Sequence, residues 1–263
     1  MIPLRPIQSI VIREFKRFFR QRGRLLSALA RPLLWLFILG TGITRIVETP
    51  AGVSYLQFLF PGVLGMVVLF SSIHSALSTV YDREFGVMRL IIVAPISRLA
   101  IVSAKVASGS LLSLFQAGLL LCLAPLIGLP LGLGQILLLT VYVLLTAVAI
   151  TGVGMLLASR IDSLENFAGV MNFVVFPMFF LSGGLYPVKL LPATLQWVIY
   201  VNPLAYGIDL FKHALLPVEA MTLGPDFPLA SNLAVLVAFS AVTIAAATSL
   251  FDKEARLVRL AAR

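Results

Sequence analysis

Long apolar runs alternate with short polar and charged clusters along the chain. Six of these runs reach about 20 residues, the length that an α-helix needs to cross the hydrocarbon core of a bilayer. They cover about 25–45, 56–80, 99–127, 132–159, 166–187 and 230–250. The pattern therefore predicts an all-α membrane protein with six transmembrane helices, in which residues 25–250 form one membrane domain and residues 251–263 form a cytoplasmic tail.

A different repeat marks the first 24 residues. Apolar side chains there recur at helical spacing, while basic side chains occupy other faces of the same helix. The apolar positions are Ile7, Ile10, Val11, Phe15, Phe18 and Phe19, and the basic positions are Arg13, Lys16, Arg17 and Arg20. Residues 1–24 therefore predict an amphipathic interfacial helix on the cytoplasmic leaflet, which serves either as an anchor on anionic membrane lipid or as a binding surface for a partner.

Composition and charge agree with a membrane protein and orient it. Hydrophobic residues make up 60% of the chain, charged residues make up 12%, and the mean hydropathy is +1.03. Of the 20 Lys and Arg residues, all but Arg45, Lys189 and Lys212 fall on one side of the predicted spans. The positive-inside rule places that side, with both termini, in the cytoplasm. Topology thus explains the net charge of +9, and the chain needs no nucleic acid partner.

Few charged or catalytic groups lie within the predicted spans. Arg31 and Lys105 sit only one or two turns inside the cytoplasmic ends, where long side chains can reach the interface. His74 and His213 fall on opposite sides of the membrane and Cys122 is the single cysteine, so we expect no metal site and no catalytic residue. No span carries Asp or Glu near its middle, and the phosphate-binding motif G-x-x-x-x-G-K-[ST] is absent. We therefore expect a chain that is not an enzyme and that draws the energy for any transport from another subunit.

One cytoplasmic and one external segment have more structure than a simple connection needs. The cytoplasmic segment YDREFGVMRLIIVAPISR, Tyr81 to Arg98, predicts a short helix over about 81–95 with charged and apolar faces. Such a helix suits a groove on a soluble partner, or an amphipathic tether between spans. The external segment, about 188–217, predicts two short helices that separate at Asn202 and Pro203. Because neither piece can cross a bilayer alone, we interpret it as a re-entrant helical hairpin between the fifth and sixth spans.

The tetrapeptide LSGG, residues 181–184, also begins the signature loop of ATP-binding cassette ATPases. Here it follows the apolar sequence MNFVVFPMFF and precedes Leu185 instead of a polar residue, so it lies at the outer end of the fifth span. Ser182, Gly183 and Gly184 allow the helix to end, and Pro187 prevents its continuation. The motif therefore predicts an external turn and no ATP site on this chain.

Two sequence blocks resemble signatures of the ABC-2 family, the membrane subunits of type-2 ABC exporters. The first block is DREFGVMRLIIVAPISR followed by Lys105, and the second is LSGGLYPVKLLPATLQWVIYVNPLAYGIDLFKHAL. The resemblance implies a permease subunit in the cytoplasmic (inner) membrane. It also implies a homodimer that works with two copies of a separate cytoplasmic ABC ATPase, which binds ATP and Mg²⁺, so that this chain binds no cofactor itself.

The resemblance further implies roles for individual residues. Those expected to couple to the ATPase are Asp82, Arg83, Glu84, Gly86, Arg89, Arg160, Asp162 and Glu165. Those expected at the external gate and hairpin are Ser182, Gly183, Gly184, Pro187, Pro192, Asn202, Pro203 and Asp209.

The apolar walls of the predicted spans favour an apolar or amphipathic cargo. The residues that we expect along the pathway are His74, Gln116, Phe173 and Phe176. The predicted function is ATP-driven export of an amphipathic drug-like, lipid or lipid-linked substrate by alternating access. The alternative is a membrane scaffold without transport, or a regulatory or resistance subunit of an ABC complex.

Overall fold

The computed structural model describes residues 4–20, 30, 32–40, 42, 54–93, 96–216 and 224–261, with the side chains of 4–6, 39, 89, 92–93 and 252–261 left aside. Across these ranges the chain forms helices and no strands, which confirms the predicted all-α class there. The elements are α1 (Leu4–Arg20), η1 (Trp35–Leu39), α4 (Tyr55–Glu84), α5 (Val87–Val93), α6 (Arg98–Leu121), η3 (Ala124–Ile127), α7 (Leu133–Ala158), α8 (Leu164–Phe180), η4 (Val188–Leu190), α9 (Ala193–Val201), α10 (Pro203–Leu215) and α11 (Leu229–Ala261).

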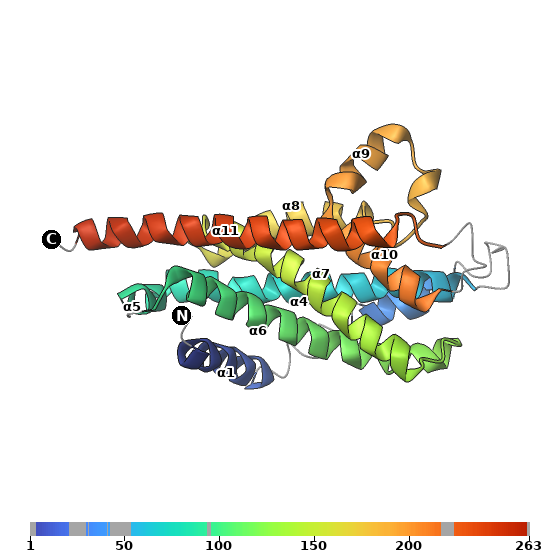
Figure 1. Ribbon diagram of the computed structural model, residues 1–263, viewed down its shortest axis with the longest axis horizontal. Helices are drawn as coiled ribbons and strands as arrows, with labels where there is room; N and C mark the ends of the chain where they lie inside the picture. The colour runs from blue at the N-terminus through green and yellow to red at the C-terminus, as the bar shows by residue number, and fades with distance from the viewer. Residues whose placement is uncertain are drawn as a thin grey trace.

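Long helices pack side by side around α4, which contacts α6, α7, α8 and α10 (Figure 1). In the described part of the chain, four helices are long and apolar enough to cross a membrane: Tyr55–Glu84, Arg98–Leu121, Leu133–Ala158 and Leu229–Phe251. They fall on the second, third, fourth and sixth predicted runs. In the apolar stretch of α4, 83% of the residues are buried, so this helix forms the centre of the bundle.

The other two predicted runs differ from these four. About half of the first run, 25–45, lies outside the described residues, and within it Trp35–Leu39 forms a short π-helix. The fifth run, 166–187, becomes the 17-residue helix α8, which ends at Phe180. The chain turns there because Gly183 adopts a φ of 71°, a left-handed conformation that glycine accepts without strain. The six-span arrangement therefore stays a prediction.

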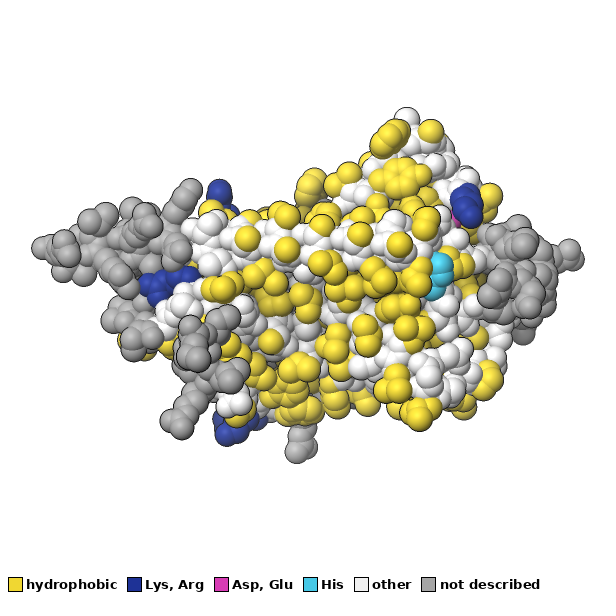
Figure 2. Space-filling view, viewed as in Figure 1, with side chains coloured by type: hydrophobic (Ala, Val, Ile, Leu, Met, Phe, Trp, Pro, Cys, Tyr) yellow, Lys and Arg dark blue, Asp and Glu magenta, His cyan; other side chains and the backbone are white. Residues whose placement is uncertain are grey.

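The two ends of the bundle differ in what they carry. The helices α1 and α5 and the C-terminal part of α11 lie toward one end, while α9 and α10 lie toward the other (Figure 1). On the face shown in Figure 2, hydrophobic side chains fill the middle, and Lys and Arg side chains gather toward the ends. This distribution is typical of a helix bundle that is solvated by lipid around its middle.

The segment around 188–217 contains the two helices that the sequence predicts, with their break at Asn202. The helix α9 ends at Val201, and α10 begins at Pro203. Most side chains of α10 are buried where it contacts α4, α7 and α11, whereas most of α9 is exposed. The predicted dip of this pair into the outer leaflet stays a prediction.

The segment 81–98 does not form the single short helix that was expected over 81–95. The helix α4 continues through Glu84, because no residue before Gly86 breaks it. Gly86 has a φ of 76° and turns the chain into the seven-residue helix α5. Asp82, Arg83 and Glu84 therefore belong to the last turn of α4 and not to the short helix.

Candidate functional site

Three consecutive residues at the end of α4 contact three different parts of the molecule. Each step along an α-helix turns the side chain by about 100°, so Asp82, Arg83 and Glu84 point in separate directions. Asp82 faces α1 and α6, Arg83 faces the turn between α7 and α8, and Glu84 reaches the first turn of α8. The end of α4 is thus a junction at which α4 meets α1, α6, α7 and α8.

Asp82 lies in an ionic cluster with Glu14 and Lys105, which are buried, and with Arg13, which is partly exposed. The Nζ of Lys105 donates to Asp82 Oδ2 at 2.7 Å and to Glu14 Oε1 at 2.8 Å. Arg13 Nη2 donates to Asp82 Oδ2 at 2.6 Å and to Glu14 Oε1 at 3.1 Å. The Lys105 side chain is only 2% exposed, so it does not reach the interface as the sequence suggested. It turns inward because two carboxylates from α1 and α4 compensate its charge. Arg31, for which the same was expected, lies outside the described residues.

The charges in this cluster control the protonation of Glu14. Burial by itself raises the pKa of the Glu14 carboxyl, but Lys105 and Arg13 outweigh this effect and hold the pKa below its ordinary value of 4.5. Burial likewise lowers the pKa of Arg13, but the carboxylates of Asp82 and Glu14 outweigh it and raise that pKa. Glu14 and Arg13 are therefore charged near neutral pH, and the cluster holds α1 against α4 and α6.

The lowered pKa of Glu14 makes the attachment of α1 to α4 and α6 sensitive to acid. A carboxyl whose folded-state pKa is lowered stabilises the fold above its unfolded pKa, and the stabilisation is lost as the pH falls through the folded-state value. We expect the melting temperature to fall as the pH is taken below 4.5, and to fall less steeply in Glu14→Gln. Thermal unfolding in detergent between pH 7 and pH 3 measures this. The exposed Glu165→Gln is the control and should keep the wild-type slope; equal slopes in all three proteins would contradict the assignment.

Arg83 and Glu84 fix the turn that enters α8. Arg83 Nη1 donates to the carbonyl oxygens of Ala158 at 2.7 Å and Ile161 at 3.1 Å, and lies 3.5 Å from the Asp162 carboxylate. Glu84 Oε2 accepts from the backbone N–H of Leu164 at 2.8 Å, at the N-terminus of α8. A carboxylate there satisfies a free backbone donor and complements the helix dipole. The two segments that were predicted to contact the ATPase, one at the end of α4 and one before α8, are therefore bound to each other.

Three large apolar side chains next to this junction are exposed, Tyr81, Phe85 and Leu90, and we call them the α5 patch. The exposed fractions are 38%, 59% and 74%, and the rings of Tyr81 and Phe85 lie 4.3 Å apart. Large exposed apolar groups that lie together at one end of a helix bundle are typical of a surface that binds another protein. Of the other residues that the sequence assigned to coupling, Arg160, Asp162 and Glu165 are exposed around the start of α8, and the side chain of Arg89 lies outside the described set.

At the opposite end, the LSGG turn packs directly against α4. A Cβ built on Gly62 of α4 would lie 2.1 Å from the carbonyl oxygen of Gly184, so the two backbones touch at a point that only glycine allows. The Ser182 hydroxyl donates to the Phe179 carbonyl and is buried. Pro187 and Pro192 precede η4 and α9. The turn is thus a packed structural element at the N-terminal end of α4.

Asn202 connects α8 to α10. Its Oδ1 accepts from Leu204 N at 3.0 Å and caps α10, and its Nδ2 donates to the carbonyl oxygens of Met178 at 2.7 Å and Leu181 at 2.6 Å. Pro203 follows as the first helical residue. One amide therefore starts α10 and closes the end of α8.

We expect Asn202→Ala to lower the free energy of unfolding by about 2 kcal/mol. Loss of an N-cap contributes about 1 kcal/mol, and two partly buried carbonyls that lose a donor add about as much. Thermal or denaturant unfolding in detergent measures the change. Thr194→Ala, on the exposed face of α9, is the matched control and should leave stability unchanged. A loss in Asn202→Ala no larger than in the control would contradict this role.

A second buried ion pair joins α10 to the segment before α11. Lys212 Nζ lies 2.7 Å from Asp226 Oδ2, with side-chain exposures of 1% and 3%. Asp209 accepts from Asp226 N at 2.6 Å and from Asn232 Nδ2 at 2.7 Å. The sequence pointed to Asp209 but not to Asp226 or Asn232, whose only signal was their polarity near an apolar run.

Of the four residues expected along the pathway, His74 and Phe176 both lie beside the ring of Phe70, at 6.3 Å and 6.4 Å between ring centroids, and the other two lie elsewhere. Gln116 is buried, and its amide donates to Ser71 at 2.7 Å, so it joins α6 to α4. His74 Nδ1 lies 2.7 Å from the Phe70 carbonyl oxygen within α4. Phe173 is 83% exposed and Phe176 is 43% exposed on α8, where Asn172 is also exposed. Asn172 was not among the residues expected along the pathway. A polar residue in the middle of an apolar helix indicates a face that lipid does not solvate well.

Among the described residues, no group of three or more His, Cys, Asp or Glu side chains is arranged to hold a metal ion.

Comparison with known proteins gives the site its context. A family model described as ABC-2 type transporter matches residues 5–216. The transport permease ycf38 of Cyanophora paradoxa is 30% identical over 216 residues, which cover 78% of this chain and 73% of that protein. The inner membrane transport permease YadH of Escherichia coli K12 is 27% identical and covers 89% of both chains. Nodulation protein J of Rhizobium meliloti is 32% identical over 202 residues, which cover 73% of this chain and 74% of that protein.

Proposed function

This chain belongs to the ABC-2 type transporter family and is a transmembrane permease subunit of an ABC transporter, and from this premise we propose that it exports an amphipathic substrate. The partner that family membership implies is an ABC ATPase subunit. The proposal adds a homodimer of six-span subunits with both termini in the cytoplasm, two ATPase subunits that hold ATP and Mg²⁺, and a drug-like, lipid or lipid-linked cargo.

The observation that carries the proposal is the junction at the end of α4. The α5 patch offers an ATPase an apolar surface, while Asp82, Arg83 and Glu84 attach that end to α1, α6 and α8. A displacement of the patch must therefore move these elements together. Asp82 is only 3% exposed, so we assign it to positioning α1 and α6 and not to direct contact with the ATPase.

The same helix carries the displacement to the outer side. Gly62 lies 22 residues before Glu84, a distance of roughly 33 Å along an α-helix. Because Gly62 touches the LSGG turn and α10 packs on α4, tilting of α4 moves the external turn and hairpin. ATP can drive transport in this way only if the substrate binds the inward and outward states differently.

We place the substrate pathway along the exposed face of α8. Asn172, Phe173 and Phe176 lie there, and Phe176 packs edge-to-face on Phe70 of α4 at 6.4 Å. A face that is both aromatic and polar suits an amphipathic cargo or a second copy of the chain better than lipid tails.

The docking surface has a direct test in a pair of matched variants. Leu90 in the α5 patch is 74% exposed, and Leu126 in η3 is 75% exposed near the other end of α6. When the chain is co-expressed with its partner ABC ATPase, we expect Leu90→Asp to weaken co-purification at least about tenfold, because a charge replaces an apolar contact. Leu126→Asp should bind the ATPase like wild type. Equal binding in both variants would place the docking surface elsewhere, and wild-type protein that binds no ATPase would contradict the proposed function.

A further inference from the structure

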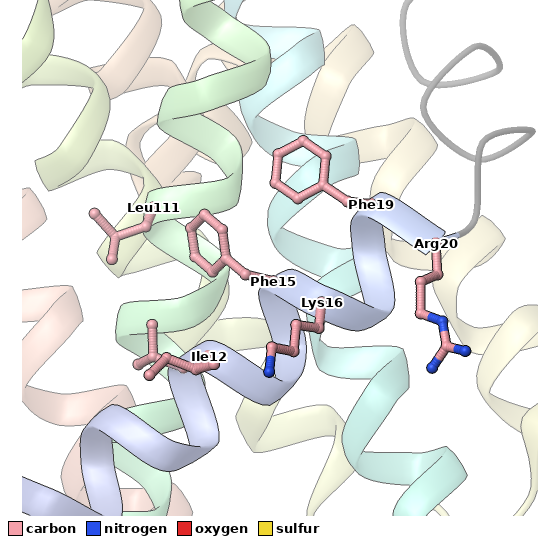
Figure 3. A pocket seen from close by; sticks show the side chains of 7 residues that line it. Ile12, Phe15, Lys16, Phe19, Arg20 and Leu111 are labelled. Atoms are coloured by element: carbon pink, nitrogen blue, oxygen red, sulfur yellow. The ribbon is translucent and has the colours of Figure 1, made fainter.

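An apolar groove of about 800 Å³ runs between α1 and α6, away from the junction at the end of α4. Val11, Ile12, Phe15 and Phe19 line it from α1, and Leu111 lines it from α6. In Figure 3, Phe15 is directed toward Leu111 across the groove. The volume lies in the range of about 300–1,000 Å³ that small-molecule sites occupy.

The walls of this groove are apolar and uncovered. Ile12 is 53% exposed, Phe19 is 48% exposed and Leu111 is 40% exposed. The surface continues to Phe115, which is 37% exposed and whose ring lies 5.3 Å from that of Phe19. Such a continuous patch on the outside of a membrane domain suits a hydrocarbon chain.

Two basic side chains from α1 border the same groove. Lys16 and Arg20 are exposed, and within the described ranges no acidic side chain pairs with either. By contrast, Arg13 and Arg17 face the carboxylate of Asp82. Residues four apart on a helix are neighbours, at about 5–6 Å between their Cβ atoms, so Lys16 and Arg20 can contact one anionic group together.

We propose that this groove binds one anionic phospholipid of the inner leaflet. An acyl chain lies against Phe15, Phe19 and Leu111, and the phosphate lies between Lys16 and Arg20. The pairing of an apolar groove with two exposed cations selects this ligand, since a zwitterionic phospholipid brings its own cation beside the phosphate and a soluble anion leaves the groove empty. The site is separate from the transport pathway on α8 and does not depend on it.

The test is native mass spectrometry of the purified full-length chain in detergent, titrated with dioleoylphosphatidylglycerol or dioleoylphosphatidylcholine. We expect one tight phosphatidylglycerol per chain and weaker phosphatidylcholine binding. Each basic residue near an anionic headgroup contributes about fivefold, so Lys16→Gln with Arg20→Gln should weaken phosphatidylglycerol binding on the order of 25-fold. The matched control replaces two exposed basic residues away from the groove, Arg160→Gln with Lys189→Gln, and should bind like wild type.

A second variant tests the apolar half of the site. Leu111→Trp fills the groove while both cations remain, and we expect it to weaken phosphatidylglycerol binding as well; it also serves if the double variant does not fold. Equal affinity for the two lipids, or wild-type phosphatidylglycerol binding in both groove variants, would overturn the proposal. Competition by inorganic phosphate would show a simple anion site, and release of the lipid when the ATPase or a second copy binds would show a protein-binding groove; either result would also overturn it.

Discussion

Lys105→Met is expected to be among the most destabilising single substitutions in the chain, lowering the free energy of unfolding by about 3 kcal/mol. The variant leaves the carboxylates of Glu14 and Asp82 buried beside each other, with side-chain exposures of 5% and 4%. Removing one partner of a buried ion pair costs about 3–5 kcal/mol, and Arg13 places this case at the lower end because it still contacts both carboxylates.

Thermal unfolding in detergent measures the effect as a melting temperature roughly 6–12 °C below wild type. Lys189→Met is the matched control, because Lys189 is exposed on η4 and has no ion pair in the described part of the chain. Adding Asp82→Asn to Lys105→Met should recover part of the loss, since it removes one of the uncompensated charges. Equal melting temperatures for Lys105→Met and Lys189→Met would show that the cluster does not stabilise the fold.

Gly62→Ala should have an effect of similar size at the other end of α4. The added Cβ would lie 2.1 Å from the Gly184 carbonyl oxygen and 2.8 Å from its Cα, so α4 and the LSGG turn must move apart. Backbone cannot give way as a side-chain tip can, and overpacking of this kind costs about 3 kcal/mol.

The control uses the same substitution at an open position. A Cβ at Gly118 of α6 would meet nothing within 4 Å, so Gly118→Ala should be neutral or stabilising by up to about 1 kcal/mol, because alanine favours the helix. Comparing the two melting temperatures separates the backbone contact from any general effect of adding a methyl group. If Gly62→Ala were as stable as Gly118→Ala, the result would contradict a direct backbone contact between α4 and the LSGG turn.

Local signals in the sequence predicted much of the helical framework. Apolar runs gave four of the long helices, and Asn202 with Pro203 gave the break between α9 and α10. These features depend on neighbouring residues, since a run of apolar residues or an N-cap acts within a few turns of the chain. The end of the fifth run was predicted too late because the chain already turns at Leu181, before Pro187.

The junction itself could not be predicted in the same way. Lys105 is paired with Asp82 and with Glu14, which lie 23 and 91 residues away, and no repeat links these positions. From the sequence, a lysine near the end of a span indicates a side chain that reaches the interface, and only tertiary packing shows that it turns inward. The resemblance pointed to the segment Asp82–Glu84, but it could not show that three adjacent residues contact three different neighbours.

In the proposed function, ATP hydrolysis on a partner subunit moves an amphipathic cargo outward through this chain. The most direct measurement uses proteoliposomes with the ATPase on the outside, and follows the redistribution of a panel of fluorescent amphipathic dyes and labelled lipids. The account predicts ATP-dependent accumulation of at least one probe in the lumen or luminal leaflet, and its loss when either subunit is omitted. ATP hydrolysis by the assembled complex without redistribution of any probe would contradict the claim and favour a scaffold or regulatory subunit; movement in the opposite direction would contradict export.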